Sequence, residues 1–75
     1  MMGAGYAARL TFRLGRRFST FIRPEYAPNT LEGATLYLTL ESVQYAVTLV
    51  REQTESMGAK FIGVEYFHDG KRVTL

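Results

Sequence analysis

Residues 35–75 show a pattern of apolar and polar positions typical of a strand, a helix and a hairpin in succession. In the middle of this part, apolar residues recur at spacings of three and four, which indicates one apolar stripe along a helix. Thr39 or Ser42 can cap its first turn, and Gly58 can adopt the left-handed conformation that ends many helices. We therefore predict a helix over residues 41–57.

Strands with a period of two flank this helix. Three leucines alternate with threonine and tyrosine over residues 35–40, which predicts a strand directly before it. After the helix, residues 60–68 and 71–75 flank Asp69-Gly70. A type I′ turn needs positive φ at both central positions, which this dipeptide can adopt, so the two segments are predicted to pair as a hairpin. The predicted pairs are His68 with Lys71, Phe67 with Arg72, Tyr66 with Val73, Glu65 with Thr74 and Val64 with Leu75.

The first third of the chain predicts a second hairpin. Apolar residues alternate with arginine and threonine up to Leu14, and a second apolar stretch starts at Phe18. A three-residue turn over residues 15–17 would place Leu14 opposite Phe18 and keep the apolar residues of both strands on one face. A two-residue turn is the alternative, but it would place residues of opposite faces against one another. We therefore predict a basic hairpin over residues 8–23.

Together these elements predict one α+β domain, in which an antiparallel sheet of four or five strands packs on a single α-helix. The predicted order is β-β-β-α-β-β, and the sequence does not specify the order of the strands within the sheet. The predicted segments of the single domain 1–75 are a flexible N-terminus (1–7), the basic hairpin (8–23), a loop (24–34), a strand (35–40), the helix (41–57) and the C-terminal hairpin (60–68 and 71–75).

One helix covers only one face of such a sheet, so the other face is left for solvent or a partner. The predicted register directs these residues toward the helix: Leu10, Phe12, Leu14, Leu36, Leu38, Ile62, Val64, Tyr66 and Val73. The opposite face then carries Arg9, Thr11, Arg13, Thr35, Tyr37, Thr39, Phe61, Glu65, Phe67 and Arg72. Large aromatic side chains on an exposed face are typical of binding sites. Burial under the loop, or in a homodimer, would explain the same aromatic residues.

Charge is distributed unevenly along the chain. Residues 1–24 contain five arginines and no acidic residue, whereas the remainder has four basic and seven acidic residues, a balance of −3. Such asymmetry indicates an acidic partner. A charged edge strand that discourages aggregation explains it equally well.

Targeting and compartment follow from the same composition. The acid-free start and the segment Arg16–Thr20 resemble a mitochondrial presequence, but the period of two favours a strand over an amphipathic helix. The absence of cysteine favours a reducing, cytoplasmic compartment. No apolar run reaches the length of a membrane span, so no membrane partner is predicted.

Catalytic chemistry has few candidate residues. His68 and Asp69 are the only histidine and aspartate in the chain, and as neighbours at a hairpin turn they cannot orient one another as a catalytic triad requires. The serines lie in no nucleophile context. One histidine with scattered carboxylates gives no metal-ligand spacing. We therefore predict no enzyme, no cofactor and no metal site.

The chain resembles two classes of protein. Over residues 37–65 it resembles the small linker domains of phycobilisomes, on the residues Tyr37, Thr39, Met57, Gly58, Lys60, Val64 and Glu65. It departs from them by lacking a Val-Pro-Tyr signature before the helix and by carrying Gly58-Ala59 where they have paired glycines. In size and element order the chain is also similar to small phage-encoded inhibitors such as anti-CRISPR proteins. The first resemblance implies an assembly subunit and the second implies an inhibitor.

The prediction from sequence is a non-enzymatic module that binds a larger protein or complex stoichiometrically, as a small inhibitor or adaptor. Its predicted partner-binding residues are Arg9, Arg13, Arg16, Arg17, Tyr37, Phe61, Phe67 and Arg72. Arginine and aromatic residues are enriched at protein interfaces. The alternative is a nucleic-acid-binding domain, because the same side chains could stack bases and contact phosphates.

Overall fold

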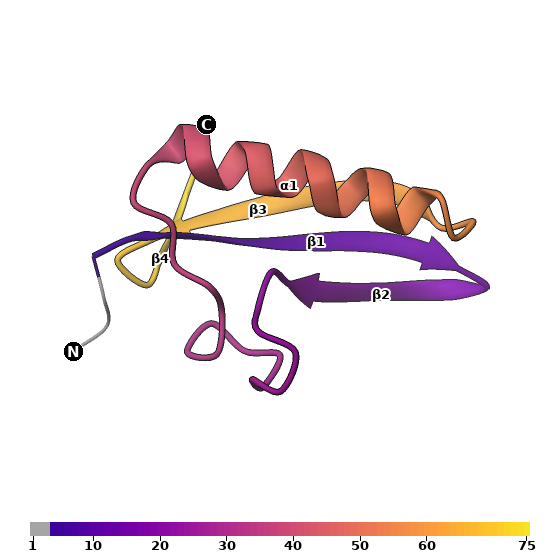
Figure 1. Cartoon of the computed structure of the whole chain (residues 1–75), viewed down its shortest axis with the longest axis horizontal. Coiled ribbons are helices and arrows are strands. Elements are labelled where there is room, and N and C mark those ends of the chain that lie inside the picture. The colour runs from indigo at the N-terminus through magenta and orange to yellow at the C-terminus, as the bar shows by residue number, and fades with distance from the viewer. Residues whose placement is uncertain (1–3) are drawn as a thin grey trace.

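The computed structural model describes residues 4–75 and contains one antiparallel sheet and one helix (Figure 1). The elements, in chain order, are β1 (Tyr6–Leu14), β2 (Arg16–Phe21), α1 (Leu40–Glu55), β3 (Lys60–His68) and β4 (Lys71–Val73). The four strands lie in the order β2-β1-β3-β4. This arrangement confirms a small α+β fold with an antiparallel four-stranded sheet on a single helix.

The strand predicted over residues 35–40 is wrong, so the element order is β-β-α-β-β. Within residues 35–40, only Tyr37 pairs with a strand, through an isolated bridge to Tyr6. The chain turns away because Thr39 is the N-cap of α1 and accepts a hydrogen bond of 3.1 Å from the backbone N–H of Ser42. The alternating leucines therefore lie in the segment that leads into α1 and not in a strand. Leu38 is 90% exposed.

The predicted bounds of the helix and of the N-terminal segment differ from the observed ones. α1 ends at Glu55, two residues before the predicted end, and a turn then leads to Gly58 at φ 98°. Tyr6 and Ala7 belong to β1, so the predicted flexible N-terminus is too long. Residues 1–3 of that prediction lie outside the described residues.

The N-terminal hairpin is tighter than predicted. Leu14 pairs with Arg16 and Phe12 with Phe18, a shift of two residues from the predicted register. The reason is Gly15, which adopts φ 73° and is the single residue between the strands. A shift of two keeps the faces intact, and the Phe12 and Phe18 rings stack at 5.7 Å between centroids.

The C-terminal hairpin has the predicted turn and the predicted first three pairs. Asp69 and Gly70 both have positive φ, as a type I′ turn requires. The pairs are His68 with Lys71, Phe67 with Arg72 and Tyr66 with Val73. The predicted pairs Glu65–Thr74 and Val64–Leu75 are not formed, because β4 ends at Val73.

A bulge in β3 changes which side chains face the helix. β1 pairs with β3 in one register up to Thr11 with Gly63 and in another from Phe12 with Phe61, so Ile62 is an extra residue. A one-residue slip exchanges the two faces of a strand. Phe61 therefore faces α1, where its ring meets Phe12 at 5.7 Å, and Ile62 faces the other side. The sequence prediction had these two residues reversed.

The core lies between α1 and the centre of the sheet. Val43 and Val47 of α1 are buried against Leu10 and Phe12 of β1, both of which are fully buried. Three leucines predicted to face the helix are largely exposed instead: Leu14, Leu36 and Leu38. The apolar stripe of α1 thus packs on β1 and β3 and leaves the hairpin tip outside the core. No helix within residues 4–75 is long and apolar enough to cross a membrane.

The connection from β2 to α1 runs beside β2 (Figure 1). Phe21 faces away from α1 but is only 7% exposed, and Ala7 is 1% exposed. Asn29 fixes this connection to the outer edge of β2. Its Oδ1 accepts the backbone N–H of Phe21 at 2.9 Å, and its Nδ2 donates to the backbone carbonyl of Ser19 at 3.1 Å. At this edge of the sheet, the Asn29 side chain therefore makes hydrogen bonds that a neighbouring strand would otherwise make.

Candidate functional site: the open sheet face

The sheet face that points away from α1, here called the open face, presents side chains in cross-strand rows. The register defines one row of Arg9, Glu65 and Phe21, a second of Thr11, Ser19 and Gly63, a third of Arg13, Arg17 and Lys60, and a pair of Phe67 and Arg72. Polar side chains of the first two rows and Arg72 have partners on this face, whereas the third row has no ion pair within residues 4–75.

The third row, here called the basic row, consists of Arg17, Arg13 and Lys60 on three adjacent strands. All three residues are exposed. Among the described residues, the ion pairs involve Arg9, Arg51 and Arg72, and none reaches the basic row. Like charges directly opposite one another destabilise a sheet. The row is therefore a concentration of positive charge without a carboxylate in contact.

The first row is satisfied internally. The Nε of Arg9 donates to Glu65 Oε1 at 2.8 Å, and the Nε of Arg72 lies 3.5 Å from Glu65 Oε2. The Arg9 guanidinium also lies over the rings of Phe21 and Phe67, at 5.3 and 5.5 Å from their centroids. The aromatic side chains of this face are thus already in contact with a cation of the same chain.

The open face has a charge opposite to that of the rest of the molecule. It carries five basic residues and one acidic residue, a net charge of +4, whereas the whole chain has +2 and the remainder therefore −2. α1 alone contains three glutamates against Arg51. A concentrated field of this sign attracts anionic partners and orients them toward the sheet.

Five of the predicted binding residues lie on the open face: Arg9, Arg13, Arg17, Phe67 and Arg72. Arg16 begins β2 and pairs with Leu14 at the hairpin tip, outside the rows. Tyr37 and Phe61 are on the other side of the sheet, packed against the core. The predicted binding residues omit Lys60 and the paired hydroxyls of Thr11 and Ser19, although Thr11 was predicted to lie on this face. Because of the bulge, alternation along β3 does not place Lys60 on the open face. For Thr11, the alternation of β1 was the available signal.

Two tyrosines on the helix side give the protein a predictable response to alkaline pH. Burial raises the pKa of Tyr37 and Tyr66 above the ordinary value. The folded protein therefore holds these protons more tightly than the unfolded chain does. The free energy of unfolding should be unaffected by them below about pH 10 and fall as pH rises through and above that value.

This prediction is checked by measuring the urea midpoint from neutral to alkaline pH. The variant Tyr37→Phe/Tyr66→Phe should lose less stability than the wild type in the alkaline range. Tyr26→Phe is the matched control, because Tyr26 is 93% exposed. Identical alkaline loss in all three proteins would contradict the prediction.

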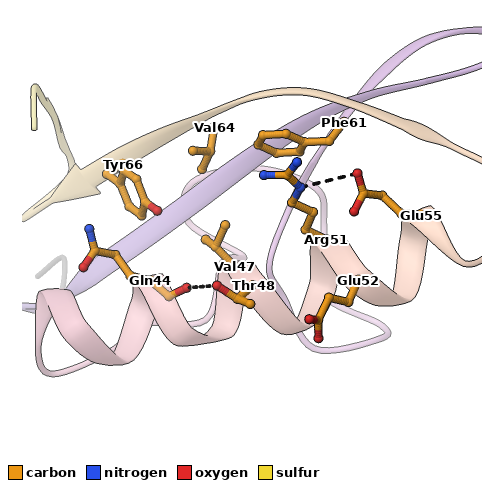
Figure 2. Close-up of a pocket in the computed structure, with 9 residues that line it drawn as sticks. All are labelled: Gln44, Val47, Thr48, Arg51, Glu52, Glu55, Phe61, Val64 and Tyr66. Carbon is orange, nitrogen blue, oxygen red and sulfur yellow. Dashed lines mark hydrogen bonds and ion pairs between the residues drawn. The ribbon is translucent and has the colours of Figure 1, made fainter.

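A second concave surface lies between α1 and β3 (Figure 2). This groove has a volume of about 480 Å³ and is lined by Val47, Phe61 and Val64 together with polar residues of α1. Arg51 lies over the Phe61 ring at 4.2 Å and forms an ion pair of 3.4 Å with Glu55. The charge of Arg51 is therefore paired within the groove, in contrast to the charges of the basic row.

No protein-family model, curated protein or solved structure matches the chain. The resemblances to phycobilisome linker domains and to phage-encoded inhibitors remain predictions.

Proposed function

We propose that the protein is a non-enzymatic binding module that associates stoichiometrically with an acidic surface of a larger protein through its open face. It would act as a small inhibitor or adaptor. The basic row is the observation that carries this proposal, because it places three like charges side by side without a carboxylate in contact.

A partner with acidic side chains would relieve the repulsion within the basic row. Arg13 and Arg17 lie directly opposite one another and are exposed, so their guanidinium groups are free to approach carboxylates. Arginine binds a carboxylate with two parallel hydrogen bonds, which adds geometric specificity to the charge attraction. The row therefore favours a partner surface with clustered glutamate or aspartate.

The arrangement of the aromatic residues favours a protein over a single-stranded nucleic acid. Single-strand-binding sheets stack bases on exposed aromatic rings. Here Phe61 faces α1, and Phe67 is half-buried beside Phe21 and Arg9. Ile62, which is 38% exposed on the open face, adds apolar contact beside the arginines. A mixed apolar and arginine surface is typical of a protein interface.

The test is capture of the partner from nuclease-treated extract of the source cells, followed by affinity measurement with the purified partner. Arg13→Glu, at the centre of the basic row, should weaken binding about tenfold or more. Lys71→Glu changes the charge of the chain equally but lies on the helix side of β4, so its affinity should stay within about twofold.

Two results would overturn the proposal. Equal losses for Arg13→Glu and Lys71→Glu would show that only the total charge matters. Tight binding of a single-stranded oligonucleotide, weakening steeply with salt, would favour the nucleic-acid alternative.

A further inference from the structure

A hollow on the open face lies between the basic row and the row of Arg9 and Glu65. It has a volume of about 340 Å³. The hydroxyls of Thr11 and Ser19 lie on one side of it, 2.8 Å apart. Gly63 lies across from Thr11, and a side chain at this glycine would meet nothing within 4 Å. The hollow is thus the space that the missing side chain of Gly63 leaves in the sheet surface.

Hydrogen-bond donors line this hollow beside the apolar side chain of Ile62. Arg17 and Arg72 line it from the two edge strands, β2 and β4. The hydroxyl pair can turn one proton toward a ligand while the other holds the hydrogen bond between Thr11 and Ser19. Glu65 is the one acidic residue in the lining, and its two oxygens already face Arg9 and Arg72. The hollow therefore offers guanidinium and hydroxyl donors with little uncompensated negative charge.

We infer that the hollow binds a phosphate monoester, specifically a phosphorylated side chain of the partner. This inference rests on the proposed function and specifies one of the groups that the open face recognises. A monoester carries about −1.5 to −2 charge and three acceptor oxygens. One hydroxyl proton and a guanidinium that donates twice supply three donors, which match the three oxygens of a monoester, whereas a carboxylate has two oxygens.

Gly63 provides a test that changes no charge. Its φ is not positive, and the space above it is open, so Gly63→Val should fit the strand without strain. The valine would occupy the hollow and exclude a phosphoryl group. Binding of O-phosphoserine, followed by the amide shifts of the Thr11, Ser19 and Gly63 positions, should weaken about tenfold in Gly63→Val.

A second pair of variants tests the hydroxyls. Thr11→Val/Ser19→Ala should also weaken phosphoserine binding about tenfold, because it removes the hydroxyl pair that donates to the charged ligand. Thr48→Val is the matched control, since the Thr48 hydroxyl donates to the Gln44 carbonyl within α1 and lies outside the hollow. Inorganic phosphate should bind at the same residues, whereas acetate and dimethyl phosphate should bind more weakly.

The outcomes separate this inference from the proposed function. Unchanged phosphoserine binding in Gly63→Val would overturn the hollow as the site and leave only diffuse attraction to the basic row. Acetate or dimethyl phosphate binding as tightly as phosphoserine would overturn the choice of a monoester. Either result is compatible with the proposed function if Arg13→Glu still weakens binding of the partner. Phosphoserine binding that Gly63→Val abolishes, together with full partner binding by Arg13→Glu, would support the hollow and overturn the proposed function.

Discussion

Replacing Phe12 with alanine should bring the protein close to its unfolding threshold. Phe12 is among the largest fully buried side chains and contacts rings from β2 and β3. A buried phenylalanine replaced by alanine costs about 3–5 kcal/mol, through lost burial and the cavity left behind. A small domain is stable by as little as about 5 kcal/mol in total. The substitution therefore removes most of the free energy of unfolding.

Urea unfolding followed by circular dichroism measures this loss. Phe18→Ala is the matched control, because Phe18 pairs directly with Phe12 but is 36% exposed. We expect the control to lose about 1 kcal/mol or less, in line with its partial exposure. Equal losses for the two variants would mean that the hairpin tip is as buried as the centre of the sheet.

Deleting Val64 should destabilise the protein far more than deleting Ile62. Ile62 is the extra residue of the bulge, so its removal lets β1 and β3 pair continuously with Phe61 still opposite Phe12. Removal of Val64 instead brings Gly63 opposite Leu10 and takes an apolar side chain from the helix side. We expect a loss of about 2 kcal/mol or more for Val64 and less than about 1 kcal/mol for Ile62.

Both deletion variants remove one residue from the same strand, so each is the control for the other. The free energy of unfolding from urea titration gives the comparison directly. Nuclear Overhauser contacts between the Phe61 and Phe12 rings should persist after deletion of Ile62. A larger loss for Ile62 than for Val64 would place the bulge at another residue.

The elements that the sequence predicted well are those whose signals are local. Asp69-Gly70 determines its own turn type, and the turn then determines the pairs on either side of it. The helix follows from its apolar spacing and from the cap at Thr39. Both depend on residues within a few positions of one another. Neither required knowledge of the rest of the sheet.

The incorrect predictions depend on contacts between distant segments. Residues 35–40 alternate like a strand, but β2 and β3 already pair with the two sides of β1. Only Tyr37 therefore forms a bridge, to Tyr6 at the start of β1. The bulge at Ile62 arises from how β3 aligns with β1, and alternation along β3 alone does not reveal it. A single extra residue was enough to reverse the assignment of two side chains.

The candidate site was predictable to the same extent. Arginines at alternate positions of β1 share a face whatever the partner strand, so Arg9 and Arg13 were placed correctly. Lys60 joins them only because of the bulge, and the hollow exists only because Gly63 lies across from Thr11. The sequence predicted the charge of the face, whereas its shape depends on the register between strands.

The contact between Asn29 and β2 has a consequence for how the molecule opens. The backbone N–H of Phe21 is held by a side chain of the connecting segment and not by a neighbouring strand. Detachment of that segment would therefore release this N–H and uncover the Phe21 ring, which shares Arg9 with Phe67. The connection and the end of the open face that carries Phe21 and Phe67 thus form one cooperative unit. Hydrogen exchange at the backbone N–H of Phe21 reports how often that unit opens.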